Sequence, residues 1–159
     1  MNQRNINWLA LITAILIPLI IGGMAALFTV PNIQGWYQGL NKPSFNPPKW
    51  IFAPVWNTLY VLMGVASYLI WRDRKEKNTT PALSLYFIQL ALNFFWSLIF
   101  FEFHAPGYAF IEVLLLWLFI VATILHFSRI NKAAAWLLMP YISWVSFATV
   151  LNYEIWRLN

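Results

Sequence analysis

Long apolar runs dominate the pattern of hydrophobic and polar positions along the chain. Shorter segments that carry prolines, glycines and charges separate five such runs. A helix needs about 20 apolar residues to cross the hydrocarbon core of a bilayer. Each run is therefore predicted to be a membrane-spanning helix, at about residues 8–29, 50–71, 81–101, 107–127 and 133–156.

The segments between the runs indicate where the helices end. The charged cluster at residues 72–77 stops the second run, and Pro81 suits the first turn of the third helix. The first run exceeds the roughly 7 to 15 apolar residues of a signal peptide, so we interpret it as a retained span that Pro31 ends. The long connection at residues 31–49 is rich in aromatics and prolines, which predicts a stiff capping loop.

The composition makes lipid the expected solvent of this chain. Hydrophobic residues make up 61% of it and charged residues only 9%, against about 25% charged in soluble domains. The predicted fold class is an all-α membrane protein, with residues 1–159 forming a single five-helix bundle in the lipid bilayer. The chain has no cysteine, which excludes disulfides and thiolate chemistry.

The basic residues predict how the chain is oriented in the membrane. Three of them fall on the side of the predicted capping loop, namely Lys42, Lys49 and Arg157, and seven on the N-terminal side, namely Arg4, Arg72, Arg74, Lys75, Lys77, Arg129 and Lys132. The positive-inside rule then places the N-terminus in the cytoplasm and the C-terminus outside. The net charge of +5 comes without a basic helix or an RNA-binding motif, so no nucleic-acid partner is expected.

Prolines also lie inside three predicted spans, at Pro18, Pro54 and Pro140. Each removes a backbone hydrogen bond and is expected to bend its helix. A bundle of bent helices leaves internal space more readily than a straight one. The alternative is a tolerated bend with no pocket.

Tryptophan is the most informative residue type of this sequence. Six tryptophans lie near predicted helix ends, where interfacial anchoring is the ordinary explanation: Trp8, Trp36, Trp50, Trp71, Trp136 and Trp156. Trp56, Trp96 and Trp144 lie deeper. Because an indole N–H in hydrocarbon needs a partner, these three rings are predicted to face the bundle interior, as core packing or as pocket walls.

Polar residues at membrane depth are a second signal. Asn93 lies near the centre of the third span, with Gln89 and Ser97 one turn away on the same face. Asn57 follows Trp56, and Ser143, Ser146 and Thr149 surround Trp144. Such groups bind either a neighbouring helix or a ligand.

Ionisable residues argue against several classes of function. Glu102, His104 and Glu112 lie near the outer ends of the third and fourth spans, His126 and Glu154 lie near other helix ends, and no such group occupies the middle of a span. Proton pumps and ion-coupled carriers normally place one there. The two histidines are predicted at opposite faces of the membrane, so no metal site is expected, and no catalytic constellation is recognisable.

Several segments carry a family resemblance. Residues 36–37 read WY, residues 42–60 read KPSFNPPKWIFAPVWNTLY and residues 63–64 read MG. The third span contains ALNFFWS at 91–97, and the fifth contains Pro140-Tyr141, Trp144, FATVLNY at 147–153 and Trp156-Arg157. Together these resemble the translocator protein family (TspO/MBR, tryptophan-rich sensory protein, peripheral-type benzodiazepine receptor). Phe45 departs from the tryptophan usual in that family, which removes an N–H donor.

The resemblance implies a five-helix bundle, usually dimeric, that binds porphyrins and isoquinoline-type ligands beneath the first loop. The ligand would be a tetrapyrrole such as protoporphyrin IX, with no intrinsic cofactor. The implied pocket residues are Phe52, Ala53, Trp56, Asn93, Trp96, Trp144 and Ala148. Helical spacing agrees independently, because Trp56 and Tyr60, and likewise Trp144 and Ala148, are four residues apart on one face.

The family is also associated with a sterol-recognition pattern in the fifth helix. Leu151, Tyr153 and Arg157 fit it, which makes a sterol a further candidate partner. Interfacial anchoring by Tyr153 and Arg157 explains the same residues.

Three functions are compatible with these residues. The leading hypothesis is a membrane receptor or carrier for tetrapyrroles. The second is a light- and oxygen-dependent breakdown of protoporphyrin, with Trp56 and Trp144 as electron or radical partners. The third is a scaffold without a pocket, whose helices associate through Gly22 and Ala26 of the first span.

Overall fold

The computed structural model describes residues 6–159, and this part of the chain is built from helices without strands. The long helices are α1 (Trp8–Gln34), α3 (Lys49–Arg72), α4 (Thr80–Ser97), α5 (Pro106–Ile130) and α7 (Met139–Leu158). Short elements extend or join them: α2 (Trp36–Gly39), a 3-10 turn (Asp73–Lys75), a π-helical turn (Leu98–Glu102) and α6 (Lys132–Leu137). The described chain thus has five segments long and apolar enough to cross a membrane, which confirms the predicted spans.

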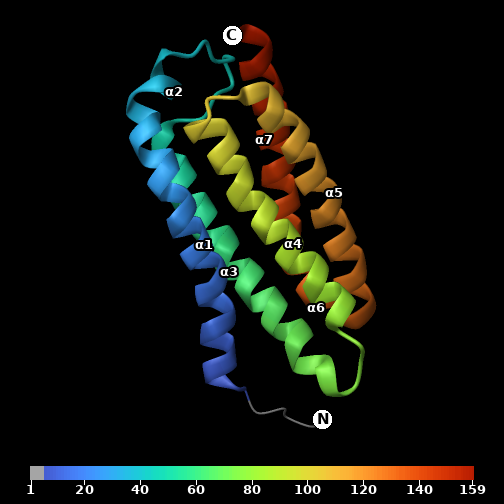
Figure 1. Cartoon of the computed structure of the whole chain (residues 1–159). Coiled ribbons are helices and arrows are strands. Elements are labelled where there is room, and N and C mark those ends of the chain that lie inside the picture. The colour runs from blue at the N-terminus through green and yellow to red at the C-terminus, as the bar shows by residue number, and fades with distance from the viewer. Residues whose placement is uncertain (1–5) are drawn as a thin grey trace.

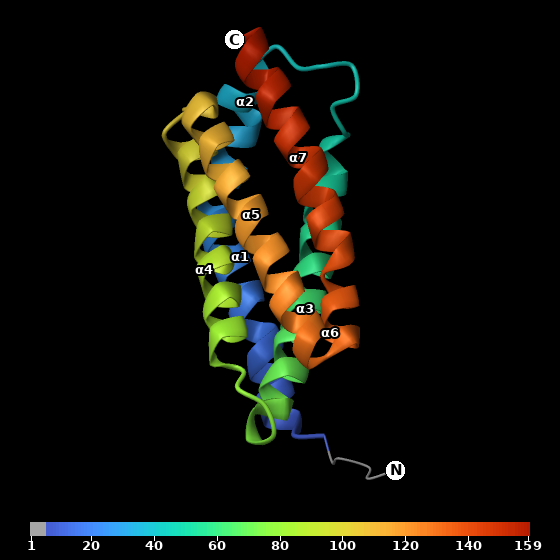
Figure 2. The same cartoon turned by 90° about the vertical axis from the view of Figure 1, so that its right-hand side faces the viewer.

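The helices form one elongated bundle. α1 begins at one end of it and α7 finishes at the other, beside α2 (Figures 1 and 2). α1 packs on α3, and α4 packs on α5, which also contacts α7. The core between them is filled by aromatic and aliphatic side chains such as Met63, Leu90 and Phe127, all fully buried.

The expectation that Pro31 ends the first helix is wrong. α1 continues through Pro31 to Gln34, and α2 occupies part of the predicted capping loop, so the irregular part of this connection runs mainly over residues 40–48. A proline costs a helix the bond to the carbonyl four residues earlier. In the same turn, the Asn32 Nδ2 donates to the Phe28 carbonyl at 2.9 Å.

Of the three prolines expected to bend their spans, Pro140 lies at a break. The helix is interrupted at Leu138, two residues before it, so α6 and α7 together make the fifth span. Pro18 and Pro54 lie inside the continuous helices α1 and α3. At Pro54 the carbonyl accepts a hydrogen bond from the Thr58 hydroxyl at 2.9 Å.

Candidate functional site: an aromatic cavity beneath the cap

A cavity of about 360 Å³ lies inside the bundle near α2. Its walls come from α1, α2, α3, the end of α4 with its π-helical turn, and α7. Binding pockets for small molecules occupy about 300 to 1,000 Å³ and are mostly apolar. The cavity thus has the size and the lining of a small-molecule pocket.

Six of the seven implied pocket residues line this cavity: Phe52, Ala53, Trp56, Trp96, Trp144 and Ala148. Trp56 stacks on Tyr60 with ring centroids 5.5 Å apart, as their helical spacing predicted. Phe52 meets the Trp144 ring edge to face at 6.0 Å. Trp56 of α3 and Trp144 of α7 therefore face a common void.

Asn93 is the exception, because it does not line the cavity. Its Oδ1 accepts from the Tyr60 hydroxyl at 2.9 Å, and its Nδ2 donates to the Tyr141 hydroxyl at 3.3 Å. Tyr141 in turn donates to Gln89 Oε1 at 2.8 Å. Asn93 thus joins α3, α4 and α7, so of the two sequence interpretations the structure supports interhelical hydrogen bonding.

A short chain of hydrogen bonds fixes the orientation of Trp96. Its indole N–H donates to Asn152 Oδ1 at 3.0 Å, and Asn152 Nδ2 donates to the Pro106 carbonyl at 2.8 Å. The Trp96 ring also stacks on Phe100 at 5.3 Å. A wall held in this way keeps its shape when the cavity is empty.

The sequence did not assign Gly22 and Ala26 to the site, yet both line it. A Cβ built on Gly22 would lie 2.2 Å from the Tyr60 ring, so this glycine leaves the space that the aromatic stack occupies. Gly22 therefore packs on α3 within the chain, and both small residues border the cavity. That they hold a scaffold together stays a prediction. The sequence shows that Gly22 and Ala26 lie on one face of α1, but not which neighbour that face meets.

Lys49 is the one charged residue among the described residues that line the cavity. Its Nζ lies 3.5 Å from the Ile33 carbonyl and 3.5 Å from Gln38 Oε1, both weak contacts, and the residue is exposed. A cation at the edge of an aromatic cavity can bind a carboxylate without being buried itself. In the sequence, Lys49 indicated the orientation of the chain and formed part of the motif at residues 42–60.

The cavity also reaches the surface of the bundle. Gly23 and Val30 of α1 and Ala53 and Asn57 of α3 line it and are exposed. These residues mark an opening between α1 and α3. A ligand dissolved in the bilayer could enter by this side.

The cap, which comprises α2 and residues 40–48, is held together by polar contacts and packs on α7 through Phe45. The Tyr37 hydroxyl donates to Asn46 Oδ1 at 2.9 Å, and burial raises the pKa of this phenol despite that bond. Desolvation and the nearby Lys49 charge lower the pKa of Lys42, whose Nζ donates to the Leu40 carbonyl at 2.6 Å. Phe45, which replaces the expected tryptophan, packs edge to face on Phe147 at 6.3 Å.

His104 lies at the same end of the bundle as the cap and contacts α1 and α2. Its ring stacks on Trp36 with centroids 4.3 Å apart, and its Nε2 lies 3.0 Å from Asn32 Oδ1. This residue has a φ of 53°, a left-handed conformation that is uncommon outside glycine. The turn between α4 and α5 is thereby tied to α1 and α2.

The three sterol-pattern residues do not form one surface. Leu151 lines the aromatic cavity, whereas Tyr153 is exposed and packs on Phe110 and Trp156. Arg157 pairs with Glu154, with 2.6 Å between Nη2 and Oε2. Their arrangement agrees better with anchoring at the membrane surface.

Most of the other polar residues noted in the sequence form hydrogen bonds within the protein. Ser143, Ser146 and Thr149 donate to carbonyls one turn back, and Ser146 also accepts from the Trp117 indole at 2.8 Å. The carboxylate oxygens of Glu112 are buried and have no hydrogen-bond partner. Residues 6–159 hold no cluster of three or more potential metal ligands, and Arg4, counted for orientation, lies outside them.

Fold and cavity together define a class: a multi-pass integral membrane protein with an aromatic pocket inside a five-helix bundle. The chain matches the TspO/MBR family over residues 14–157, and it belongs to that family. It is 38% identical to the tryptophan-rich protein TspO of Archaeoglobus fulgidus over 153 residues, which cover 96% of this chain and 99% of that protein.

Other relatives come from animals and bacteria. The chain is 46% identical to the human translocator protein over 127 residues, or 78% of this chain and 75% of that protein. It is 35% identical to the tryptophan-rich sensory protein of Cereibacter sphaeroides over 155 residues, or 98% and 94%.

Proposed function

We propose that this protein is a membrane receptor or carrier that binds a planar tetrapyrrole in the aromatic cavity. The observation that carries the proposal is that Trp56 and Trp144, from different helices, both face one void of about 360 Å³. A flat conjugated ring stacks favourably on indole faces, and it loses unfavourable contact with water there. An isoquinoline-type ligand would use the same surfaces.

The charge at the rim supports a ligand with an acidic side chain. Porphyrins such as protoporphyrin IX combine an apolar ring with carboxylates. In our proposal the ring lies between the indoles while a carboxylate reaches Lys49, whose ammonium makes only contacts of 3.5 Å in the structure. A charge-assisted bond of this kind is roughly twice as strong as a neutral one.

Titration of the detergent-solubilised protein with protoporphyrin IX tests the proposal. The shift of the porphyrin absorption band gives the affinity, and Ala148→Leu, which fills the cavity, is expected to weaken it at least tenfold. Ala91→Leu is the matched control, because Ala91 is exposed on α4 and does not line the cavity. Equal affinity of wild type and Ala148→Leu would refute binding at this site.

The rings and the rim cation are tested in the same assay. Replacing Trp56 and Trp144 together by phenylalanine should weaken binding and reduce the quenching of protein fluorescence, because two indoles next to the ligand are lost. Lys49→Gln should weaken protoporphyrin but not its dimethyl ester, which has no carboxylate. A similar loss for both ligands would show that Lys49 does not bind the acid.

Repeating the porphyrin titration under light tests the second hypothesis, a light- and oxygen-dependent breakdown of protoporphyrin. Trp56 lies beside two tyrosine rings, Tyr60 at 5.5 Å and Tyr141 at 6.3 Å, an arrangement suited to passing an electron inward. Light- and oxygen-dependent loss of porphyrin that the Trp56 and Trp144 double variant lacks would indicate catalysis. Porphyrin spectra that stay unchanged under light and oxygen would support binding without catalysis.

The orientation predicted from the basic residues also stays a proposal. The described bases of the N-terminal side gather at the end of the bundle where α3 meets α4 and α5 meets α6, which supports a cytoplasmic location for that end. A cysteine introduced at Lys75 should then react with a membrane-impermeant reagent only in inverted vesicles. Reaction in intact cells would reverse the assignment.

A further inference from the structure

A second cavity lies at the opposite end of the bundle from the cap. It has a volume of about 420 Å³ and is lined by the first turns of α1, the last turns of α3 and the beginning of α4. Its walls are largely apolar, with Leu9, Ile17, Leu83 and Phe87 among them. No residue of this cavity is shared with the aromatic cavity.

This cavity opens sideways to the surface that faces lipid. Leu9 is 78% exposed and Phe87 is 48% exposed, although both line the cavity. In Figure 1, α1 and α4 diverge towards this end and leave α3 visible between them. The cavity is thus a groove that an acyl chain can enter directly from the bilayer.

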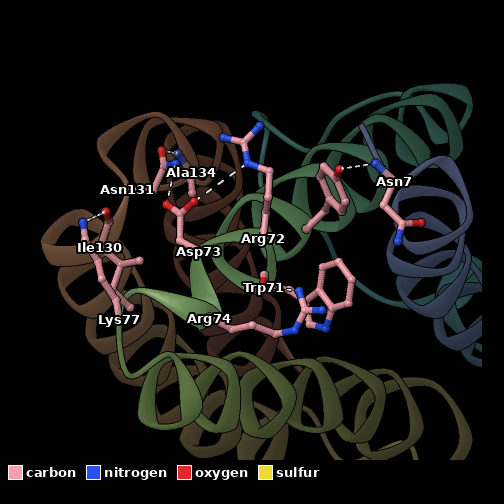
Figure 3. A network of polar contacts seen from close by, with 10 residues as sticks. Asn7, Trp71, Arg72, Asp73, Arg74, Lys77, Ile130, Asn131 and Ala134 are labelled. Carbon is pink, nitrogen blue, oxygen red and sulfur yellow. Dashed lines mark hydrogen bonds and ion pairs between the residues drawn. The ribbon is translucent and has the colours of Figure 1, made fainter. Parts of the chain in front are cut away.

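Cations lie at the mouth of the groove. Trp71 forms part of its wall, and the Arg74 guanidinium lies over that indole, 3.4 Å from the ring centroid. Figure 3 shows the Arg74 side chain running along the Trp71 ring. This contact holds a positive charge where the apolar wall ends.

Arg72 adds a second positive charge. Its Nε is buried and forms an ion pair with the Asp73 carboxylate at 3.8 Å. Arg72 follows Tyr68 by one helical turn, and Tyr68 lines the groove. The segment from Arg72 to Lys77 carries four bases against Asp73 and Glu76, a net charge of +2.

We propose that this groove is a binding site for an anionic phospholipid. One acyl chain lies along Leu9, Ile17 and Phe87, and the phosphate lies beside Arg72 and Arg74. A zwitterionic phospholipid fits the groove equally well but gains less from these charges. A sterol fills the groove without using the guanidinium groups. The charge complementarity therefore selects the anionic phospholipid.

Native mass spectrometry of the detergent-solubilised protein tests this site. Phosphatidylglycerol and phosphatidylcholine with identical acyl chains are added in parallel, and phosphatidylglycerol is expected to bind more tightly. The variant Arg72→Gln with Arg74→Gln should lose about 20-fold in affinity for phosphatidylglycerol and remove the preference. The matched control is Arg129→Gln with Lys132→Gln, which removes two charges from the same end of the bundle but from α5 and α6, helices that contribute no residue to the groove.

The groove itself is tested without changing charge. Thr13 is exposed and lines the groove, so Thr13→Trp should block the acyl chain and lower binding of phosphatidylglycerol. Ile12→Trp is its control, because Ile12 is 52% exposed and lies outside the lining. Equal binding of the two lipids overturns the proposal. So does a loss of affinity as large in the control variants as in the groove variants.

Discussion

Asn93 shows how a single amide organises this membrane core. It lies between the hydroxyls of Tyr60 and Tyr141, which come from α3 and α7, while Gln89 accepts from Tyr141. All four residues are buried, so water cannot replace these bonds. The network also sets the height of the Tyr60 ring, on which Trp56 stacks. Asn93 therefore shapes the aromatic cavity from below without touching what enters it.

Asn93→Leu keeps the side-chain volume and removes this hydrogen-bonding group. The Tyr60 hydroxyl then has no partner, which should lower the free energy of unfolding by about 1 to 2 kcal/mol. Thermal unfolding in detergent measures the change. Ser97→Ala, one turn further on α4, serves as the control and should stay within about 0.5 kcal/mol of wild type. An unchanged Asn93→Leu variant would mean that Tyr60 has another partner.

Tyr37 gives the cap a dependence on pH. Its phenol donates to Asn46, and burial raises its pKa above the ordinary value of about 10. Since the folded pKa is the higher one, the stabilisation is complete below about pH 10 and is lost as the pH rises through the folded value. Hydrogen exchange of residues 37–48 should therefore accelerate more between pH 9 and 11 than the intrinsic rate does. Tyr37→Phe should show no such excess.

At the scale of elements, the backbones of α1 and α3 approach each other closely at Gly64. A Cβ on Gly64 would lie 2.5 Å from the Ile15 Cα and 2.7 Å from the Ala14 carbonyl oxygen. Because these are backbone atoms, neither can move aside alone. Below this crossing the helices bound the second groove, and above it they bound the aromatic cavity. The crossing thus separates two spaces that lie towards opposite ends of the bundle.

Gly64→Ala should push α1 away from α3 and destabilise the bundle by about 1 to 3 kcal/mol. Gly23→Ala is the matched control, because a Cβ on Gly23 meets no atom within 4 Å. That control should be neutral or slightly stabilising, since alanine favours helix more than glycine does. Unfolding of both variants in detergent decides the comparison, and equal midpoints would contradict a backbone contact at Gly64.

At the scale of the whole molecule, the cap is joined to the other end of the chain. The Asn159 side chain accepts from the Asn41 N–H at 2.9 Å and donates to the Asn41 carbonyl at 3.0 Å. Asn41 Nδ2 also donates to the Leu158 carbonyl at 3.3 Å. The segment over the cavity is thus held by α7, the helix that carries Trp144 and Ala148.

Asn159→Ala removes two of these hydrogen bonds and should release the cap. Amide hydrogen exchange in residues 40–48 is expected to become up to about 30-fold faster, since the two bonds together contribute about 2 kcal/mol. Leu158→Ala is the control, because only its backbone carbonyl contacts Asn41. The same exchange rate in wild type and Asn159→Ala would show that aromatic packing alone holds the cap.

The sequence by itself determined the five spans and the pairing of residues on each helix face. A bilayer requires about 20 apolar residues with internally satisfied backbone bonds, and the helical period places Trp56 with Tyr60 and Trp144 with Ala148. Only the tertiary structure decided what each face meets. It buried Asn93 between tyrosines, turned Gly22 towards the cavity and carried α1 past Pro31, because the direction of a face and the partner of a polar group depend on neighbouring helices.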